Sequence, residues 1–215
     1  MKPCEDCFHC NECYNLIAHG HAIVIATDGT CNHNDRPDAV AACGIFFNVD
    51  SPHNKAFQIH DRPSISQRAE LRAAVYALRA FTKMLTAGHF RKKGYVSEVI
   101  IKSDSAYLVN GMTSWVINWR ANGYMNSRGQ HLRNQGLFRE LDRLCNDLMM
   151  LGVQTRFWHV PREDNQQADK LANAALDETV VSTSPTRIPT SSRLTVLVET
   201  MVARMPEQPA ASTST

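Results

Sequence analysis

The chain has 215 residues, of which 43% are hydrophobic and 20% are charged, and its formal net charge is +2 at pH 7. This length and composition are typical of one globular domain with short extensions. The longest apolar runs fall well short of the roughly 20 residues that span a bilayer, and the N-terminus lacks the apolar core of a secretory signal. We therefore expect an intracellular protein, in the cytoplasm, nucleus or mitochondrion, whose seven cysteines are thiols or metal ligands rather than disulfides.

The first 20 residues are unusually rich in cysteine and histidine. Thiolates and imidazoles at such short separations are ligands of tetrahedral zinc sites, but structural sites usually pair two such groups across a dozen or more residues. Zinc binding therefore stays open, and the close spacing favours a reduced, partly ordered leader. The residues concerned are Cys4, Cys7, Cys10 and Cys13, with His9, His19 and His21.

The first predicted strand is an apolar run, residues 22–26, that leads through Thr27 to Asp28. A short apolar run bounded by polar turn formers is typical of a strand buried on both faces. A carboxylate at the end of such a strand is costly to bury, so Asp28 needs a cation, a hydrogen-bond donor or water. This raises the question of whether other acidic residues converge on Asp28.

Two further strands, residues 39–48 and 55–60, are expected to form a β-meander with the first one. A helix is predicted from residue 66 to about residue 87, with Ser66 as its N-cap and Glu70 in its first turns. The helix dipole mildly favours a carboxylate near the N-terminus, so Glu70 alone says little about function.

Residues 99–105 repeat the opening pattern, because a β-branched run ends in Asp104 and a small hydroxyl residue. Two strands that each deliver an aspartate at the C-terminal end indicate parallel neighbours sharing a site. A parallel connection needs a crossover, and the helix that begins at residue 66 can provide it.

Residues 111–139 are rich in aromatic and basic residues, and no acidic residue occurs between Asp104 and Glu140. Such a stretch suits a phosphate backbone and sugar faces. Alternatively, it forms a pair of short helices whose tryptophans belong to the core. We expect both, with Trp115 packed inward and the arginines facing outward.

An amphipathic helix is expected from about residue 134 to residue 151, followed by a strand over residues 154–160 that Pro161 stops. The last predicted helix carries a fourth candidate carboxylate, Asp169, among apolar residues. Residues 179–215 are rich in Ser, Thr and Pro and are expected to be a largely disordered tail, with residues 194–202 as a short docking element.

Four sequence blocks, in this order, resemble the type 1 ribonucleases H over roughly residues 20–178. Residues 115–120 (WVINWR) also resemble the start of the basic protrusion, or handle, of that family. The resemblance implies an α/β ribonuclease H-like fold over residues 21–178, in which helices flank a mixed five-stranded sheet whose first three strands are antiparallel. The blocks are residues 27–30 (TDGT), 66–71 (SQRAEL), 103–107 (SDSAY) and 168–172 (ADKLA).

The resemblance also implies endonucleolytic hydrolysis of the RNA strand of RNA–DNA hybrids, with 5′-phosphate and 3′-hydroxyl ends. Asp28, Glu70, Asp104 and Asp169 would hold two Mg²⁺ ions, with Mn²⁺ as an alternative. Four carboxylates could not stay ionised at close range without divalent cations. Two such ions would activate a water and stabilise the leaving 3′ oxygen. We expect a monomer, and the sequence indicates no protein partner.

Recognition of the hybrid should rest on its shape and its 2′-hydroxyl groups. By resemblance, residues beside the acids would line the RNA strand, the handle would contribute Trp115, and Asn134 would approach the DNA strand. Each could instead serve turn or capping chemistry. The residues beside the acids are Gly29, Thr30, Cys31, Asn32, Ser66, Gln67 and Ala106.

The sequence departs from the family in residues 160–165, which are shorter than the usual Gly- and His-rich loop and contain no histidine. The nearest imidazole, His159, falls within a strand, where a packing role is favoured. A catalytically weak or inactive hybrid-binding module and a nuclease or integrase relative are therefore alternatives. The four carboxylates argue against the first alternative, and the handle-like stretch argues against the second.

Overall fold

The computed structural model of this chain describes residues 21–33, 36, 38–60, 65–90 and 95–177. The predicted leader with Cys4, Cys7, Cys10 and Cys13 and the predicted tail, residues 179–215, lie outside the described residues. No helix in the described part of the chain is long and apolar enough to cross a membrane.

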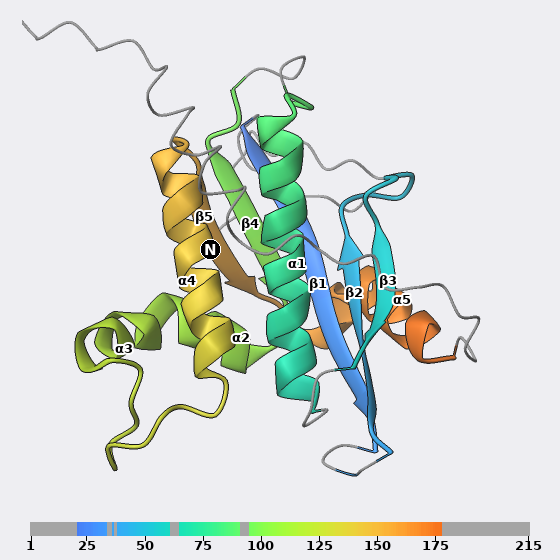
Figure 1. Cartoon of the computed structure of the whole chain (residues 1–215). Coiled ribbons are helices and arrows are strands. Elements are labelled where there is room, and N and C mark those ends of the chain that lie inside the picture. Colours follow the sequence, from blue (N-terminus) through green and yellow to red (C-terminus); the bar gives the residue numbers. More distant parts are fainter. Residues whose placement is uncertain (1–20, 34–35, 37, 61–64, 91–94, 178–215) are drawn as a thin grey trace, which may run out of the picture.

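Five strands form one mixed sheet in the order β3-β2-β1-β4-β5 (Figure 1). The strands β1, β2 and β3 are antiparallel, whereas β4 is parallel to β1 and β5 is parallel to β4. The predicted mixed sheet with three antiparallel strands first is confirmed. The bounds are β1 (Ala22–Asn32), β2 (Val40–Phe46), β3 (Lys55–Ile59), β4 (Glu98–Ser103) and β5 (Gln154–His159).

Two long helices, α1 and α4, cover one face of the sheet, and α5 covers the other face (Figure 1). An arm built from α2, a π-helical turn at Gly111–Trp115, and α3 lies between β4 and α4 in the sequence. The helices are α1 (Ser66–Thr86), α2 (Ala106–Asn110), α3 (Val116–Asn122), α4 (Gln135–Met150) and α5 (Gln166–Asp177).

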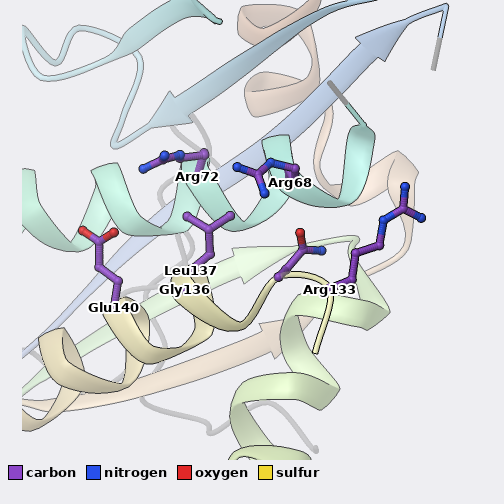
Figure 2. A pocket seen from close by; sticks show the side chains of 7 residues that line it. Arg68, Arg72, Arg133, Gly136, Leu137 and Glu140 are labelled. Carbon is purple, nitrogen blue, oxygen red and sulfur yellow. The ribbon is translucent and has the colours of Figure 1, made fainter. Parts of the chain in front are cut away.

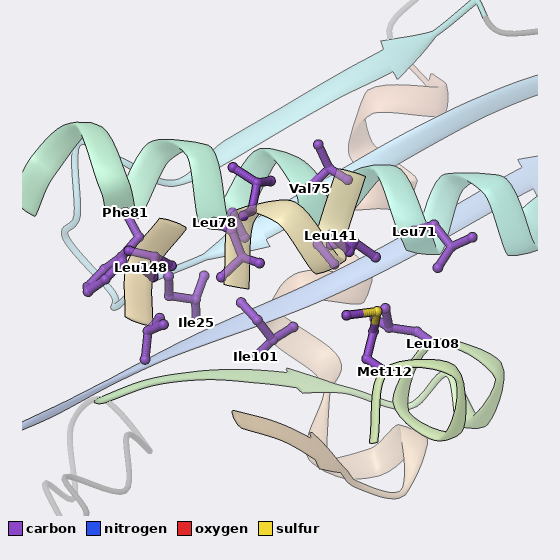
Figure 3. Packing of buried hydrophobic residues seen from close by; sticks show 14 of the residues in the cluster. Ile25, Leu71, Val75, Leu78, Phe81, Ile101, Leu108, Met112, Leu141 and Leu148 are labelled. Carbon is purple, nitrogen blue, oxygen red and sulfur yellow. The ribbon is translucent and has the colours of Figure 1, made fainter. Parts of the chain in front are cut away.

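The main core lies between the sheet and the paired helices α1 and α4 (Figure 3). Apolar residues recur every three or four positions on both helices, so each presents a continuous apolar face. Full burial of one such side chain stabilises the fold by roughly 1.5–3 kcal/mol. Members of this core include Ile25, Leu71, Val75, Leu78, Phe81, Ile101, Leu141, Leu144 and Leu148.

Two glycines allow helices to lie directly against strands. A Cβ atom at Gly29 in β1 would lie 2.0 Å from the backbone nitrogen of Glu70, and one at Gly44 in β2 would lie 2.1 Å from the carbonyl oxygen of Ala168. Both distances are too short for any side chain. Because Gly29 adjoins Asp28 and Ala168 adjoins Asp169, these two contacts fix where the predicted acidic residues lie.

The strand that carries Asp28 is longer than predicted. We expected it to end at Asp28, but β1 continues to Asn32 because its antiparallel partner β2 stays paired with it through Val40. The parallel pairing with β4 stops earlier, at Ala26 and Lys102. Asp28 therefore lies within β1, just beyond the point where β1 and β4 part.

The predicted N-cap role of Ser66 is wrong. Ser66 is the first residue of α1, and Ile65 precedes it in extended backbone with no side-chain cap. The Ile65 carbonyl accepts from the backbone N–H groups of Arg68 and Ala69 at 3.0 and 3.2 Å. The start of the helix is thus set by the buried Ile65 rather than by a side-chain hydroxyl.

The inward packing expected for Trp115 is also wrong, because Trp115 is 39% exposed. It lies at the end of the π-helical turn, whose wider turn changes the angular spacing of the residues that follow. Trp119 takes the inward position instead, with its ring 4.8 Å from that of Phe138 in α4.

We expect Gly44→Ala to destabilise the protein by about 1–3 kcal/mol, because the added methyl group must displace α5 from β2. Urea unfolding followed by circular dichroism would measure the change. Gly136→Ala is the matched control, since a Cβ there meets nothing within 4 Å and the position lies in α4. Equal stability of the two variants would contradict the close approach at Gly44.

Candidate active site

Three carboxylates meet where β1, β4 and α1 come together. Asp28 comes from β1, Glu70 from α1, and Asp104 follows β4 directly. One oxygen of each lies within 4.8 Å of an oxygen of the other two. The structure therefore brings Glu70 and Asp104 to Asp28.

The fourth predicted acid, Asp169, lies outside this group of three. It is in the first turn of α5, and both of its carboxylate oxygens accept hydrogen bonds. Arg162 Nη2 donates to Oδ1 at 2.7 Å, and Asn173 Nδ2 donates to Oδ2 at 3.0 Å. Asp169 is nevertheless close enough for its charge to raise the pKa of Asp28.

Burial and mutual repulsion dominate the chemistry of the site. Burial, then the charges of Asp104 and Asp169, raise the pKa of Asp28 from 3.8 to about 7. The pKa of Glu70 is also raised well above its ordinary value, by burial and then by Asp28 and Asp104. A hydrogen bond from the Gly29 backbone opposes this rise without cancelling it.

The donor set fits a hard divalent cation. Asp28 is only 5% exposed, and Glu70 Oε2 is buried with no hydrogen-bond partner among the described residues. Buried carboxylate oxygens that lack a partner call for a proton or a cation. Oxygen ligands are those that Mg²⁺ prefers. The cation would be held by the three grouped carboxylates, Asp28, Glu70 and Asp104.

A buried asparagine ties the site together. Asn165 is 0% exposed, and its Nδ2 donates to the carbonyl oxygen of Thr27 at 3.0 Å and to Asp104 Oδ1 at 3.1 Å. The backbone carbonyl of Asn165 accepts from the backbone N–H of Asp169 at 3.1 Å. The residue that precedes α5 is thus joined by its side chain to β1 and to the residue that follows β4. We did not single it out from the sequence, where the only signal was an amide residue before a helix.

The loop without a histidine, which we call the tied turn, is a short turn held in place by a hydrogen bond from β4. Residues Arg162–Asp164 form one turn of 3₁₀-helix after Pro161, and Lys102 Nζ donates to the Asp164 carbonyl at 2.9 Å.

The packing role expected for His159 is wrong. His159 is exposed because it is the last residue of β5, and its Nε2 lies 3.2 Å from the carbonyl oxygen of Asp104.

The predicted substrate-binding residues differ in exposure. Gly29 is buried beneath Glu70, and Asn134 is only 2% exposed. Asn134 Nδ2 donates to Tyr107 Oη at 3.3 Å, while its Oδ1 has no partner in the described part of the chain. The remaining residues reach solvent to different degrees: Thr30, Cys31 and Ser66 are half-buried, and Asn32, Gln67, Ala106 and Trp115 are exposed.

A pocket lined by arginines lies between α1 and the start of α4 (Figure 2). Arg68 and Arg72 come from α1, and Arg133 precedes α4. Asn134 and Glu140 line the same pocket. Arg68 is two residues before Glu70 in α1, so this cationic pocket adjoins the element that carries an acid of the site. The sequence did not indicate that these three arginines would gather.

The arm is held against α4 by one buried acid. Asp142 is 8% exposed, and it accepts from Arg120 Nε at 3.0 and 2.9 Å and from Tyr124 Oη at 2.9 Å. Burial acts to raise the pKa of Asp142, but these hydrogen bonds outweigh burial and hold the pKa below its ordinary value. The Arg139 guanidinium lies 5.0 Å from the centre of the Tyr124 ring.

Comparison with known proteins agrees with this geometry. A model of the family RNase H matches residues 20–177. The chain belongs to the type 1 ribonuclease H family.

Its relatives include ribonuclease H1 of Rattus norvegicus, 31% identical over 157 residues that cover 71% of this chain and 50% of the relative. Ribonuclease H of Acetivibrio thermocellus is 33% identical over 151 residues, 70% of this chain and 91% of the relative. The match thus spans about half the length of the mammalian relative and most of the bacterial one.

Two solved structures share the fold. LC11-RNase H1, isolated from compost, gives a TM-score of 0.51 at 22% identity, with 73% of this chain and 96% of that chain covered. A foamy viral protease-reverse transcriptase in complex with dsDNA gives 0.53 at 22% identity, with 72% and 94% covered.

We expect the metal-free protein to lose stability as the pH rises from about 4 to about 7. In this range the folded protein keeps a proton on Asp28, whose pKa is about 7, while the unfolded chain releases it near 3.8. The folded state then binds more protons, so the free energy of unfolding falls with pH, by roughly 4 kcal/mol from Asp28 alone. The raised pKa of Glu70 acts in the same direction.

Thermal unfolding in EDTA at several pH values would measure this effect. Asp28→Asn should flatten the dependence, and Mg²⁺ should reduce it because a cation replaces the proton. A wild-type melting temperature that stays constant between pH 4 and 7 in EDTA would contradict the raised pKa.

Proposed function

We propose that this chain is an endoribonuclease that hydrolyses the RNA strand of RNA–DNA hybrids and leaves 5′-phosphate and 3′-hydroxyl ends. The observation that carries the proposal is the meeting of Asp28, Glu70 and Asp104 within 4.8 Å in a chain of the ribonuclease H family. Asp169, in the first turn of α5, would complete the acidic set.

Two Mg²⁺ ions, or Mn²⁺ in their place, would supply an activated water on one side of the phosphodiester and stabilise the leaving 3′ oxygen on the other. Burial raises the pKa values of Asp28 and Glu70, so both carboxyl groups release their protons readily only when positive charge lies near. A divalent cation would supply that charge. Asn165 keeps Asp104 oriented through its amide group.

The nucleic acid would be held by positive charge between α1 and the start of α4. Arg68, Arg72 and Arg133 line one pocket, and guanidinium groups match phosphate geometry. The arm anchored by Asp142 presents the exposed Trp115, whose ring suits a sugar or base face. A foamy viral protease-reverse transcriptase, of which 20% of the chain shares this fold with a TM-score of 0.53, has been solved with an RNA/DNA hybrid, which supports a hybrid as the ligand.

The second candidate is a module that binds hybrids and cleaves them weakly or not at all. The observation that favours it is the tied turn at Arg162–Asp164, where the family usually has a histidine-containing loop. We also propose that the protein is intracellular, as agrees with the lack of a disulfide among the described cysteines Cys31, Cys43 and Cys145, and that it is a monomer.

We expect the chain with Mg²⁺ to cleave a labelled RNA–DNA hybrid and to leave double-stranded RNA and double-stranded DNA intact. Asp104→Asn should slow cleavage by roughly a hundredfold or more, because a metal ligand contributes several kcal/mol at the transition state. The variant should keep its fold, since an amide oxygen can still accept from Asn165. Hybrid binding without cleavage, with Mg²⁺ or Mn²⁺, would select the second candidate.

We expect Arg133→Ala to weaken binding of hybrids of any sequence and to reduce the slope of log affinity against log salt by about 1, as loss of one phosphate contact should. Arg143→Ala is the control, because Arg143 lies in α4 and is not among the residues that line the pocket. Fluorescence anisotropy in EDTA would measure both variants. Equal effects of the two substitutions would contradict the proposal that the arginine pocket binds the hybrid.

A further inference from the structure

One arginine at the acidic site has no part in the function proposed so far. Arg162 lies in the short turn between β5 and α5, and its Nη2 donates to Asp169 Oδ1 at 2.7 Å. Its side chain is 74% exposed, whereas that of Asp169 is 23% exposed. The mostly exposed guanidinium of Arg162 therefore contacts Asp169, the acid that lies outside the group of Asp28, Glu70 and Asp104.

The turn that carries Arg162 is fixed to the site from both sides. Lys102 holds the Asp164 carbonyl at 2.9 Å, and Asn165 holds Thr27 and Asp104. The backbone N–H of Asn165 donates to the Arg162 carbonyl at 3.0 Å. The backbone of Arg162 is thus anchored where its charge reaches the acids, while its side chain extends into solvent as far as Asp169.

The charge of Arg162 acts beyond its direct partner. It opposes the raised pKa values of both Asp28 and Glu70. In the metal-free protein, the positive charge of Arg162 thus partly offsets the negative charge of carboxylates that could bind a divalent cation.

The pairing with Asp169 competes with any cation for the same oxygens. Oδ1 accepts from Arg162 and Oδ2 accepts from Asn173, so neither oxygen of Asp169 is without a donor. An ion pair with an arginine as exposed as Arg162 is weak. A divalent cation bound by neighbouring carboxylates can therefore displace it.

A displaced guanidinium would lie beside the place where the proposed substrate binds. Its planar set of N–H donors matches the oxygens of a phosphate group better than any other side chain does. Phosphate is also the anion that an RNA–DNA hybrid brings to the site.

We propose that Arg162 is a positioning residue that exchanges partners: it holds Asp169 while no cation is bound, and it turns to a phosphate of the nucleic acid once a divalent cation takes Asp169. This proposal rests on the proposed function for the nature of the nucleic acid. Its first half, the competition with the cation, needs no nucleic acid and can be tested alone.

The first test is calorimetric titration of Mg²⁺, repeated with Mn²⁺, into the metal-free protein without nucleic acid. Arg162→Ala should bind the cation more tightly, by roughly two- to fivefold, because a competing charge is removed. Arg162→Lys keeps the charge and should lie between that variant and the wild type. Arg156→Ala is the matched control, since Arg156 pairs with Glu98 on β4, away from the acids. Unchanged or weaker cation binding by Arg162→Ala would overturn the proposal.

The second test is hybrid binding by anisotropy, in EDTA and in Ca²⁺, with the hybrid checked for integrity on a gel. Arg162→Ala should bind the hybrid about as well as wild type in EDTA and roughly five- to tenfold more weakly in Ca²⁺, because a charge-assisted hydrogen bond forms only in the second state. An equal loss in both conditions would contradict the exchange of partners. A wild type that binds no hybrid would instead contradict the proposed function, and the calorimetric result would still decide the competition.

Discussion

The structure depends on the burial of like charges beside one another. Asp28 and Glu70 face each other because Gly29 lets α1 lie against β1, and no other residue fits there. Burial of carboxylates, and then repulsion between them, is unfavourable, and their raised pKa values express this cost. The remaining fold must therefore be stable enough to hold them, and the apolar core between the sheet and the helices α1 and α4 supplies that stability.

Polar side chains then fix the geometry that packing alone leaves loose. The Asn165 side chain joins β1 to Asp104 at the end of β4, and Asp142 joins the arm to α4 through Arg120 and Tyr124. Each is buried and hydrogen-bonded, so its loss would leave other buried polar groups without partners. The acidic site and the arm are thus oriented independently, each by one residue, on the same sheet and helix scaffold.

Much of this arrangement could be predicted from local patterns. Asp28 and Asp104 each follow an apolar run, and an acid at such a place is visible without knowledge of the fold. Buried anchors such as Asn165 and Asp142 could not be predicted, because their role depends on partners far away in the sequence. The same reason applies to the packing of Trp119 in place of Trp115, since the π-helical turn between α2 and α3 has no clear sequence signal. The two glycine contacts are likewise set by tertiary packing.

The parallel pairing of β1 with β4 has a consequence for how the protein folds. Ala22 pairs with Glu98, and Glu98 pairs in turn with Gln154, so these central strands join residues distant in the sequence. Pairings of this kind are slow to form because long loops must close first. The carboxylates come from β1, α1, the end of β4 and α5, so they cannot assemble before the last helix has docked. During synthesis on a ribosome, a chain that ends before α5 would therefore hold Asp28, Glu70 and Asp104 but lack Asp169, the fourth acid of the set.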